Sequence, residues 1–127
     1  MTLYENYVSA AGVWRWPNFT PKEIACQGTG SLLVNTPALN RLQLLRDLLG
    51  IPLTVLSAYR SPRHNALVGG APLSQHLDGA AFDLSLVLPQ REMREAAADV
   101  GFTGFGGYRS FIHIDIGRER SWGKWTF

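Results

Sequence analysis

Two segments of the chain carry the residue types from which a metal site can be built. The stretch LSQHLDGAAFDLSL (73–86) places His76 seven positions before Asp83, and the stretch FIHID (111–115) adds His113. Two imidazoles and one carboxylate are typical of a zinc site that keeps a fourth position for water, whereas an all-oxygen set favours Ca²⁺ or Mg²⁺. Each histidine also has a structural interpretation. His113 can be a core or edge residue whose ring nitrogens are hydrogen-bonded, and His76 can cap a loop. An unpaired buried carboxylate at Asp83 would be costly, and the residues alone leave both interpretations open.

The strand-like pattern around these residues predicts how they could meet. Side chains alternate between the two faces of a strand, so 81–86 and 111–116 each present apolar residues on one face. Asp83 and His113 then lie on the opposite faces of their strands from the apolar residues. If the two strands pair in the right register, these two side chains are neighbours, and a close turn through small residues brings His76 over the same face. The residues that permit this turn are Gly79, Ala80 and Ala81.

Helix signals mark four segments, which are 20–26, 35–50, 61–70 and 89–101. In the first, Thr20 and Glu23 have the spacing of a capping box. The second is the clearest, with Thr36 predicted as its cap and Gly50 as its end. Its predicted buried stripe consists of Leu39, Leu42, Leu45, Leu48 and Leu49.

Strand signals cover 51–59, 79–86 and 108–117, and the glycine-rich segment 101–107 is predicted as a turn. Because three strands are few, we expect either an aromatic N-terminal arm (residues 1–18) or the aromatic and basic tail to add another strand. The mixture predicts one α+β domain over residues 1–127, with a small, mostly antiparallel sheet and helices packed on one face.

Composition excludes several classes of protein. A single cysteine, Cys26, rules out an intrachain disulfide and a four-thiolate zinc site, and we expect it to be buried and inert. The net charge of +2 comes without a dense basic block, so no nucleic-acid partner is expected. The N-terminus has no signal-peptide pattern, and no apolar run reaches the roughly 20 residues of a membrane helix. We therefore expect a monomer that is made in the cytoplasm without membrane insertion.

The segment SAYRSPRHNALVGGAPLSQHLDGAAFDLS, followed by FIHIDIG, resembles the zinc D-Ala-D-Ala carboxypeptidase family of peptidoglycan peptidases. Relatives of that family include phage L-alanyl-D-glutamate endolysins and, more distantly, the Hedgehog signalling domain. The resemblance extends over about residues 19 to 122. The residues that carry it are Ser74, His76, Gly79, Ala81 and Asp83, followed by Phe111, His113 and Asp115.

The resemblance implies a role for each of these residues. Arg60 would face the substrate with its neighbour Tyr59, and would polarise the scissile carbonyl or hold a substrate carboxylate. Ser74 would contribute to substrate binding and orient a ligand or its loop. The implied zinc ligands are His76, Asp83 and His113.

The general base of the family does not carry over. Several relatives place a Glu or a His two or three residues before the last zinc ligand, where this chain has Phe111 and Ser110. Asp115 is the nearest acid and the candidate base; at about 7 Å along the strand it could reach a zinc-bound water or instead orient a ligand. Asp78 is a weaker candidate.

The resemblance thus implies a zinc peptidase that cleaves peptidoglycan peptides, either as a carboxypeptidase or as an endopeptidase. The alternative is a zinc-containing but non-catalytic module that binds wall or protein. A small wall peptidase without a leader fits a phage product that is released at lysis or carried in the virion.

Overall fold

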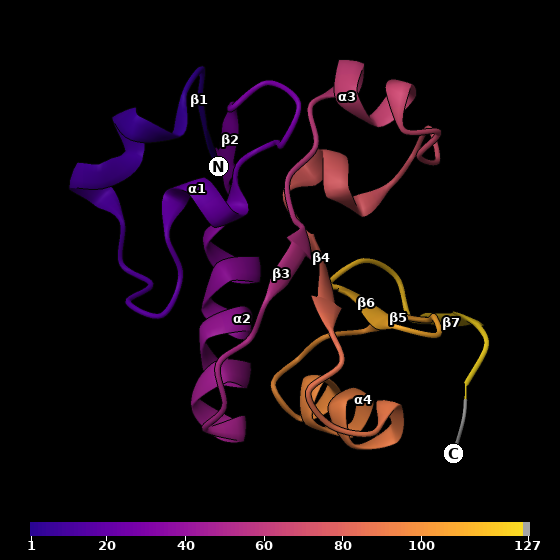
Figure 1. Cartoon of the computed structure of the whole chain (residues 1–127). Helices are drawn as coiled ribbons and strands as arrows, with labels where there is room; N and C mark the ends of the chain where they lie inside the picture. The colour runs from indigo at the N-terminus through magenta and orange to yellow at the C-terminus, as the bar shows by residue number, and fades with distance from the viewer. Residues whose placement is uncertain (126–127) are drawn as a thin grey trace.

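The computed structural model describes residues 1–125 and has an α+β architecture (Figure 1). The helices are α1 (Pro21–Ile24), α2 (Thr36–Leu49), α3 (Pro62–Leu67) and α4 (Gln90–Asp99), with two 3₁₀ segments, η1 (Tyr7–Val13) and η2 (Gln75–Asp78). The strands are β1 (Thr2–Tyr4), β2 (Leu32–Val34), β3 (Val55–Ser57), β4 (Ala81–Ser85), β5 (Gly104–Gly107), β6 (Phe111–Asp115) and β7 (Arg120–Gly123). No helix in this described part is long and apolar enough to cross a bilayer.

The helices begin close to the predicted positions. The capping box of α1 is confirmed, with both the Thr20 and the Glu23 hydrogen bonds present. For α2 the predicted cap was wrong by one residue, because the Asn35 side chain accepts from the Ala38 amide at 3.2 Å and the helix already begins at Thr36. Gly50 ends α2 in the left-handed conformation, as glycine does readily. The predicted stripe was also too wide, since Leu48 is exposed.

The main sheet has five strands in the order β3-β4-β6-β5-β7. It is mixed: three of its pairings are antiparallel, and β5 pairs with β7 in parallel. The tail supplies β7, whereas the N-terminal arm pairs with β2 in a separate two-stranded sheet. In the β4–β6 pairing Asp83 lies opposite His113, which confirms the predicted register.

One face of the main sheet forms the core with α2 and α4. Phe82 and Leu84 from β4 and Ile112 and Ile114 from β6 belong to one buried cluster, which also contains Leu39, Leu42 and Leu45 of α2 and Met93 of α4. Each fully buried side chain of this size contributes about 1.5–3 kcal/mol relative to an exposed one. The opposite face carries Asp83, His113 and Asp115, so the core positions the polar residues through strand alternation.

The segment 101–107 was predicted as a glycine-rich turn; Gly101 does lie in a turn, but residues 104–107 form strand β5. Its glycines make room for side chains from the neighbouring strands. A Cβ at Gly104 would overlap the side chains of Asp115 and Arg120, and one at Gly106 would lie 2.7 Å from the Trp122 ring. Glycine normally signals a chain reversal, but here the absence of side chains is what the packing requires.

Candidate metal centre

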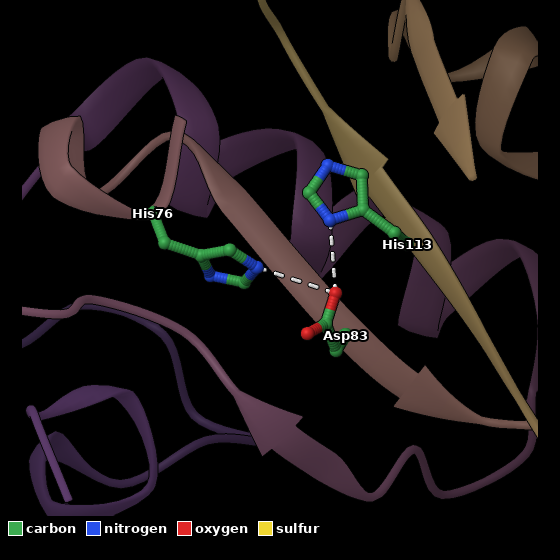
Figure 2. Close-up of side chains that lie close together, drawn as sticks. All are labelled: His76, Asp83 and His113. Carbon is green, nitrogen blue, oxygen red and sulfur yellow. Dashed lines mark hydrogen bonds and ion pairs between the residues drawn. The ribbon is translucent and has the colours of Figure 1, made fainter. Parts of the chain in front are cut away.

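His76, Asp83 and His113 come together on the polar face of the sheet. Figure 2 shows the three side chains pointing toward one another, with His76 coming from η2 while Asp83 and His113 come from the paired strands β4 and β6. All three residues are buried, and one potential ligand atom from each lies within 4.8 Å of the others. The Asp83 Oδ1 atom is 3.3 Å from His76 Nε2 and 2.9 Å from His113 Nδ1.

The backbone fixes the tautomer of His76. Its Nδ1 lies 2.6 Å from the carbonyl oxygen of Ala58, and because a carbonyl only accepts, Nδ1 carries the proton. In the neutral ring Nε2 is therefore a bare lone pair directed at Asp83. Nε2 is buried and makes no hydrogen bond to any described residue. An orphaned acceptor that faces a carboxylate requires either a proton or a cation between the two.

His113 presents a second lone pair in the same way. Its Nε2 lies 2.7 Å from Asp115 Oδ2; in the neutral tautomer with the proton on Nε2, this nitrogen donates to Asp115 and Nδ1 is unprotonated. Nδ1 then faces Asp83 Oδ1, another acceptor, at 2.9 Å. Three acceptor atoms thus converge on one point, and metal-ligating histidines commonly have their other nitrogen held by a carboxylate or a backbone carbonyl, as both are here.

The close approach of these groups shifts the pKa values of Asp83 and His113. Burial alone would raise the pKa of Asp83, but the hydrogen bond with His113 and the close approach of His76 hold that pKa well below its ordinary range. Burial alone would lower the pKa of His113, but Asp115 and Asp83 raise it above the usual value. The Asp83 carboxylate is therefore ionised at neutral pH, which is the form that can bind a divalent cation.

Asp115 lies behind His113 and is fully buried. Its oxygens accept two hydrogen bonds from the Arg120 guanidinium, at 2.9 and 2.7 Å, and one from the Gly117 amide at 2.9 Å, in addition to that from His113. Burial would raise the pKa of Asp115, but the bonds from His113 and Arg120 lower it to about 2. This arrangement suits the orientation of His113, the second of the two roles predicted for Asp115.

Arg60 is held at three points of its guanidinium. Its Nε donates to Ser57 Oγ at 3.1 Å, its Nη1 to Asn65 Oδ1 at 3.3 Å and its Nη2 to Asp83 Oδ2 at 3.4 Å. Asn65 is itself buried and donates to the carbonyl of Ala71. The guanidinium is thus fixed beside the carboxylate of the centre, with part of its surface accessible.

The centre forms one wall of a pocket of about 800 Å³. Arg60 and Ser74 line it, as do the polar residues Gln75, Arg118 and Arg120 and the aromatic residues Tyr108, Phe111 and Trp122. Among the described residues that line the pocket, Asp83 carries the only carboxylate. Guanidinium groups and aromatic rings around one polar centre favour a ligand with both anionic and apolar parts.

The remaining predicted site residues lie in different places. Ser74 caps η2 by accepting from the His76 amide at 3.2 Å, and so supports the loop that presents His76. Tyr59 is buried and does not line the pocket, so the geometry gives no support to its predicted contact with substrate. Asp78 is exposed at the end of η2 and does not line the pocket either.

The donor set fits zinc. Ligand bonds of about 2.0–2.2 Å in a tetrahedron place neighbouring ligand atoms about 3.4 Å apart, and the separations of 2.9 and 3.3 Å are close to that value. Two neutral imidazoles and one carboxylate are typical of a catalytic site, and the side toward the pocket provides the open position. The orphaned Nε2 of His76 is an independent observation that points the same way.

Sequence reasoning missed several residues that support this centre. Asn65 and Arg120 read as ordinary helix and tail residues, and Trp122 as part of an aromatic tail. The signal that could have found Arg120 is the buried carboxylate of Asp115, which demands a cationic partner. The glycines of β5 were a second signal, because several glycines in one strand indicate the close approach of side chains from its neighbours.

Comparison with known proteins places this geometry in a family. A search of curated proteins gives no match. The family model described as Peptidase M15 matches residues 17–115, which include Arg60 and all three residues of the candidate metal centre. The match spans most of the chain and agrees with the predicted resemblance to the zinc D-Ala-D-Ala carboxypeptidases. The chain therefore belongs to the peptidase M15 family.

Proposed function

We propose that this peptidase is zinc-dependent and hydrolyses peptide bonds in peptidoglycan, either at the end of the peptide stem or within the stem or its cross-link. The observation that carries the proposal is the convergence of His76 Nε2, Asp83 Oδ1 and His113 Nδ1 beside a pocket that can admit a short peptide. Bound there, zinc would supply Lewis-acid activation of water and of the scissile carbonyl.

The chain's own residues prepare the site for this chemistry. Ala58 and Asp115 orient the two imidazoles, so that their free nitrogens face one point before any ligand arrives. Arg60 is fixed beside Asp83 and offers its accessible edge to the substrate, as a partner either for the carbonyl oxygen or for a terminal carboxylate. Such preorganised charge costs no rearrangement during the reaction.

The positive charge of the pocket supports an anionic peptide as substrate. Arg60, Arg118 and Arg120 line it, and Arg120 is already engaged by Asp115. Peptidoglycan stems carry free carboxylates, which match this lining. We therefore propose that the protein acts at the cell wall, where this pocket would bind peptidoglycan peptides.

One observation favours the alternative of a zinc-containing, non-catalytic binding module. The positions of the family's general base are Ser110 and Phe111, and Asp115 lies outside the pocket lining. A binding module would retain zinc and bind wall peptides without cleaving them, so zinc content and cleavage must be measured separately.

The test is digestion of purified peptidoglycan, with new termini identified by mass spectrometry. We expect cleavage by the zinc-loaded protein and loss of cleavage with a chelator, restored by added zinc. The termini released distinguish a carboxypeptidase, which frees a terminal D-alanine, from an endopeptidase.

Matched variants define the role of the centre. His76→Ala is expected to lose stoichiometric zinc and all cleavage, whereas His64→Ala, a change of the same size on α3 outside the pocket, keeps both. Full zinc content without cleavage of any wall peptide would instead establish the binding module. Full zinc content in His76→Ala would refute the ligand assignment.

A further inference from the structure

A tyrosine on the pocket wall is held as a hydrogen-bond donor, and no motif of the sequence analysis included it. Tyr108 lies in the turn between β5 and β6, is 37% exposed and lines the pocket. Its amide donates to the Phe111 carbonyl at 3.2 Å, and its own carbonyl accepts from the Gln90 side chain at 2.7 Å. Its ring stacks on Phe111 with centroids 4.3 Å apart and planes 5° from parallel. The ring is therefore fixed by its backbone and by its neighbour.

The hydrogen bond at the phenol determines the direction of its proton. Trp122 Nε1 lies 3.0 Å from the Tyr108 hydroxyl oxygen. An indole nitrogen only donates, so the hydroxyl oxygen is the acceptor in this pair. The O–H proton of Tyr108 remains available for another acceptor, and no described residue takes it. The exposed edge of the ring thus presents a donor to whatever occupies the pocket.

Trp122 links this donor to the candidate metal centre. The ring centroids of Trp122 and His113 are 4.9 Å apart, and the Arg120 guanidinium lies over the Trp122 ring at 4.8 Å. Arg120 in turn pairs with Asp115, which orients His113. One packed group of side chains therefore sets the position of the Tyr108 hydroxyl relative to His113, with the indole as the spacer.

We propose that the Tyr108 hydroxyl donates a hydrogen bond to the oxygen of the scissile carbonyl as that oxygen gains negative charge. Tyr108 is then a catalytic residue of the peptidase reaction, and Trp122 is a positioning residue that acts through it. This inference rests on the proposed function, since it assigns the donor for the same pocket. It requires no proton transfer from Tyr108, because a hydrogen bond to the developing charge is sufficient.

Gly106, Phe111 and Arg60 are placed in ways that suit a donor role for the Tyr108 hydroxyl. Gly106 has no side chain where a Cβ would meet the Trp122 ring, so the indole can lie against β5 and reach Tyr108. Phe111, two residues before His113, supports the Tyr108 ring by stacking against it. Arg60 and Tyr108 both line the pocket, so each can offer a donor to a ligand bound there.

The test uses the zinc-loaded protein and the variant Tyr108→Phe, which keeps the ring and its stack but removes the hydroxyl. Removing one donor to a developing oxyanion lowers kcat by about 10²–10³-fold, and KM is expected to change little. Tyr4→Phe, the same chemical change on strand β1 outside the pocket, serves as the matched control and is expected to keep wild-type kcat. Zinc content and melting temperature are measured for each variant and are expected to be unchanged.

A second measurement does not depend on turnover. Calorimetric titration with a phosphinate analogue of D-Ala-D-Ala, whose phosphorus group mimics a tetrahedral anion, is expected to show about tenfold or more weaker binding to Tyr108→Phe than to the wild type. If the wild type cleaves no wall peptide, the proposed function fails, while this titration still decides whether Tyr108 serves as a donor.

The positioning role of Trp122 is tested by a double-mutant cycle. Trp122→Phe is expected to lower kcat less than Tyr108→Phe, and the double variant is expected to be no worse than Tyr108→Phe alone, because Trp122 acts through the hydroxyl. Additive losses would overturn the positioning role. Wild-type kcat and wild-type phosphinate affinity in Tyr108→Phe would overturn the proposal as a whole.

Discussion

Replacing Asp115 with asparagine tests the network behind the metal centre. The substitution keeps the size of the side chain but removes its charge. It also places an amide N–H₂ group among donors, because the Arg120 guanidinium, the Gly117 amide and His113 Nε2 all donate to this position. Asparagine can accept with its oxygen only, so at least one buried donor loses its partner.

The size of the effect follows from two contributions. The pKa of Asp115 falls from 3.8 to about 2, and at about 1.4 kcal/mol per pKa unit the folded protein favours the charged form by about 2 kcal/mol. A buried donor left without a partner adds about 1–3 kcal/mol. We therefore expect Asp115→Asn to lower the free energy of unfolding by about 3–5 kcal/mol, which is a large part of the roughly 5–15 kcal/mol of a typical domain.

The assay is equilibrium unfolding in urea at neutral pH with a chelator present, so that metal binding does not contribute. Glu119→Gln is the matched control, since Glu119 is an exposed carboxylate close by in the turn that follows β6, and it is expected to change stability by less than about 0.5 kcal/mol. In a separate titration, zinc affinity of Asp115→Asn is expected to fall about 10–100-fold, because His113 loses its orienting partner. A stability loss below about 1 kcal/mol together with unchanged zinc affinity would refute this account of Asp115.

Three further substitutions test other parts of the structure. Gly104→Ala is expected to destabilise the protein by about 2 kcal/mol, because its Cβ would displace Asp115 and Arg120; a neutral effect in urea unfolding would contradict the close packing of β5. Arg60→Lys is expected to lower kcat/KM by at least about tenfold with zinc content unchanged, since a lysine ammonium cannot reproduce three contacts of a planar guanidinium; full activity would show that the planar group is not needed. Burial alone would raise the pKa of Cys26, but hydrogen bonds involving Thr29 and Ser61 lower it to about 7 from 9.0. The thiolate absorbance at 240 nm is therefore expected to titrate near pH 7 in the native protein and to vanish in Cys26→Ser, whereas a midpoint near 9 would refute that environment.

The ligand-bearing strands were predictable because strand alternation is a strong constraint. Once apolar residues occupy one face of 81–86 and of 111–116, Asp83 and His113 must share the other face, and the antiparallel register does bring them together. The helices were predictable for a similar reason, since capping residues and leucine spacing are local signals. Only their ends differed, as with Asn35, which competes with Thr36 for the same cap.

The supporting contacts were not predictable from local signals. The hydrogen bond from His76 to the Ala58 carbonyl joins residues 18 positions apart, and Trp122 meets Tyr108 across 14 positions. Such contacts depend on the order of strands in the sheet, which the sequence pattern left open. The strand β5 was missed because glycine weakens every local strand signal, and its role appears only when the side chains of the adjacent strands are known.

The parallel strand β7 has a practical consequence for work on this family. The segment that matches the family model ends at residue 115, yet the guanidinium that neutralises Asp115 and the indole beside His113 both come from 120–123. A recombinant fragment trimmed to the matched residues would keep His76, Asp83 and His113 but would leave the buried carboxylate of Asp115 without its cationic partner. Domain boundaries for expression, fusion partners or shuffling should therefore extend beyond this last strand.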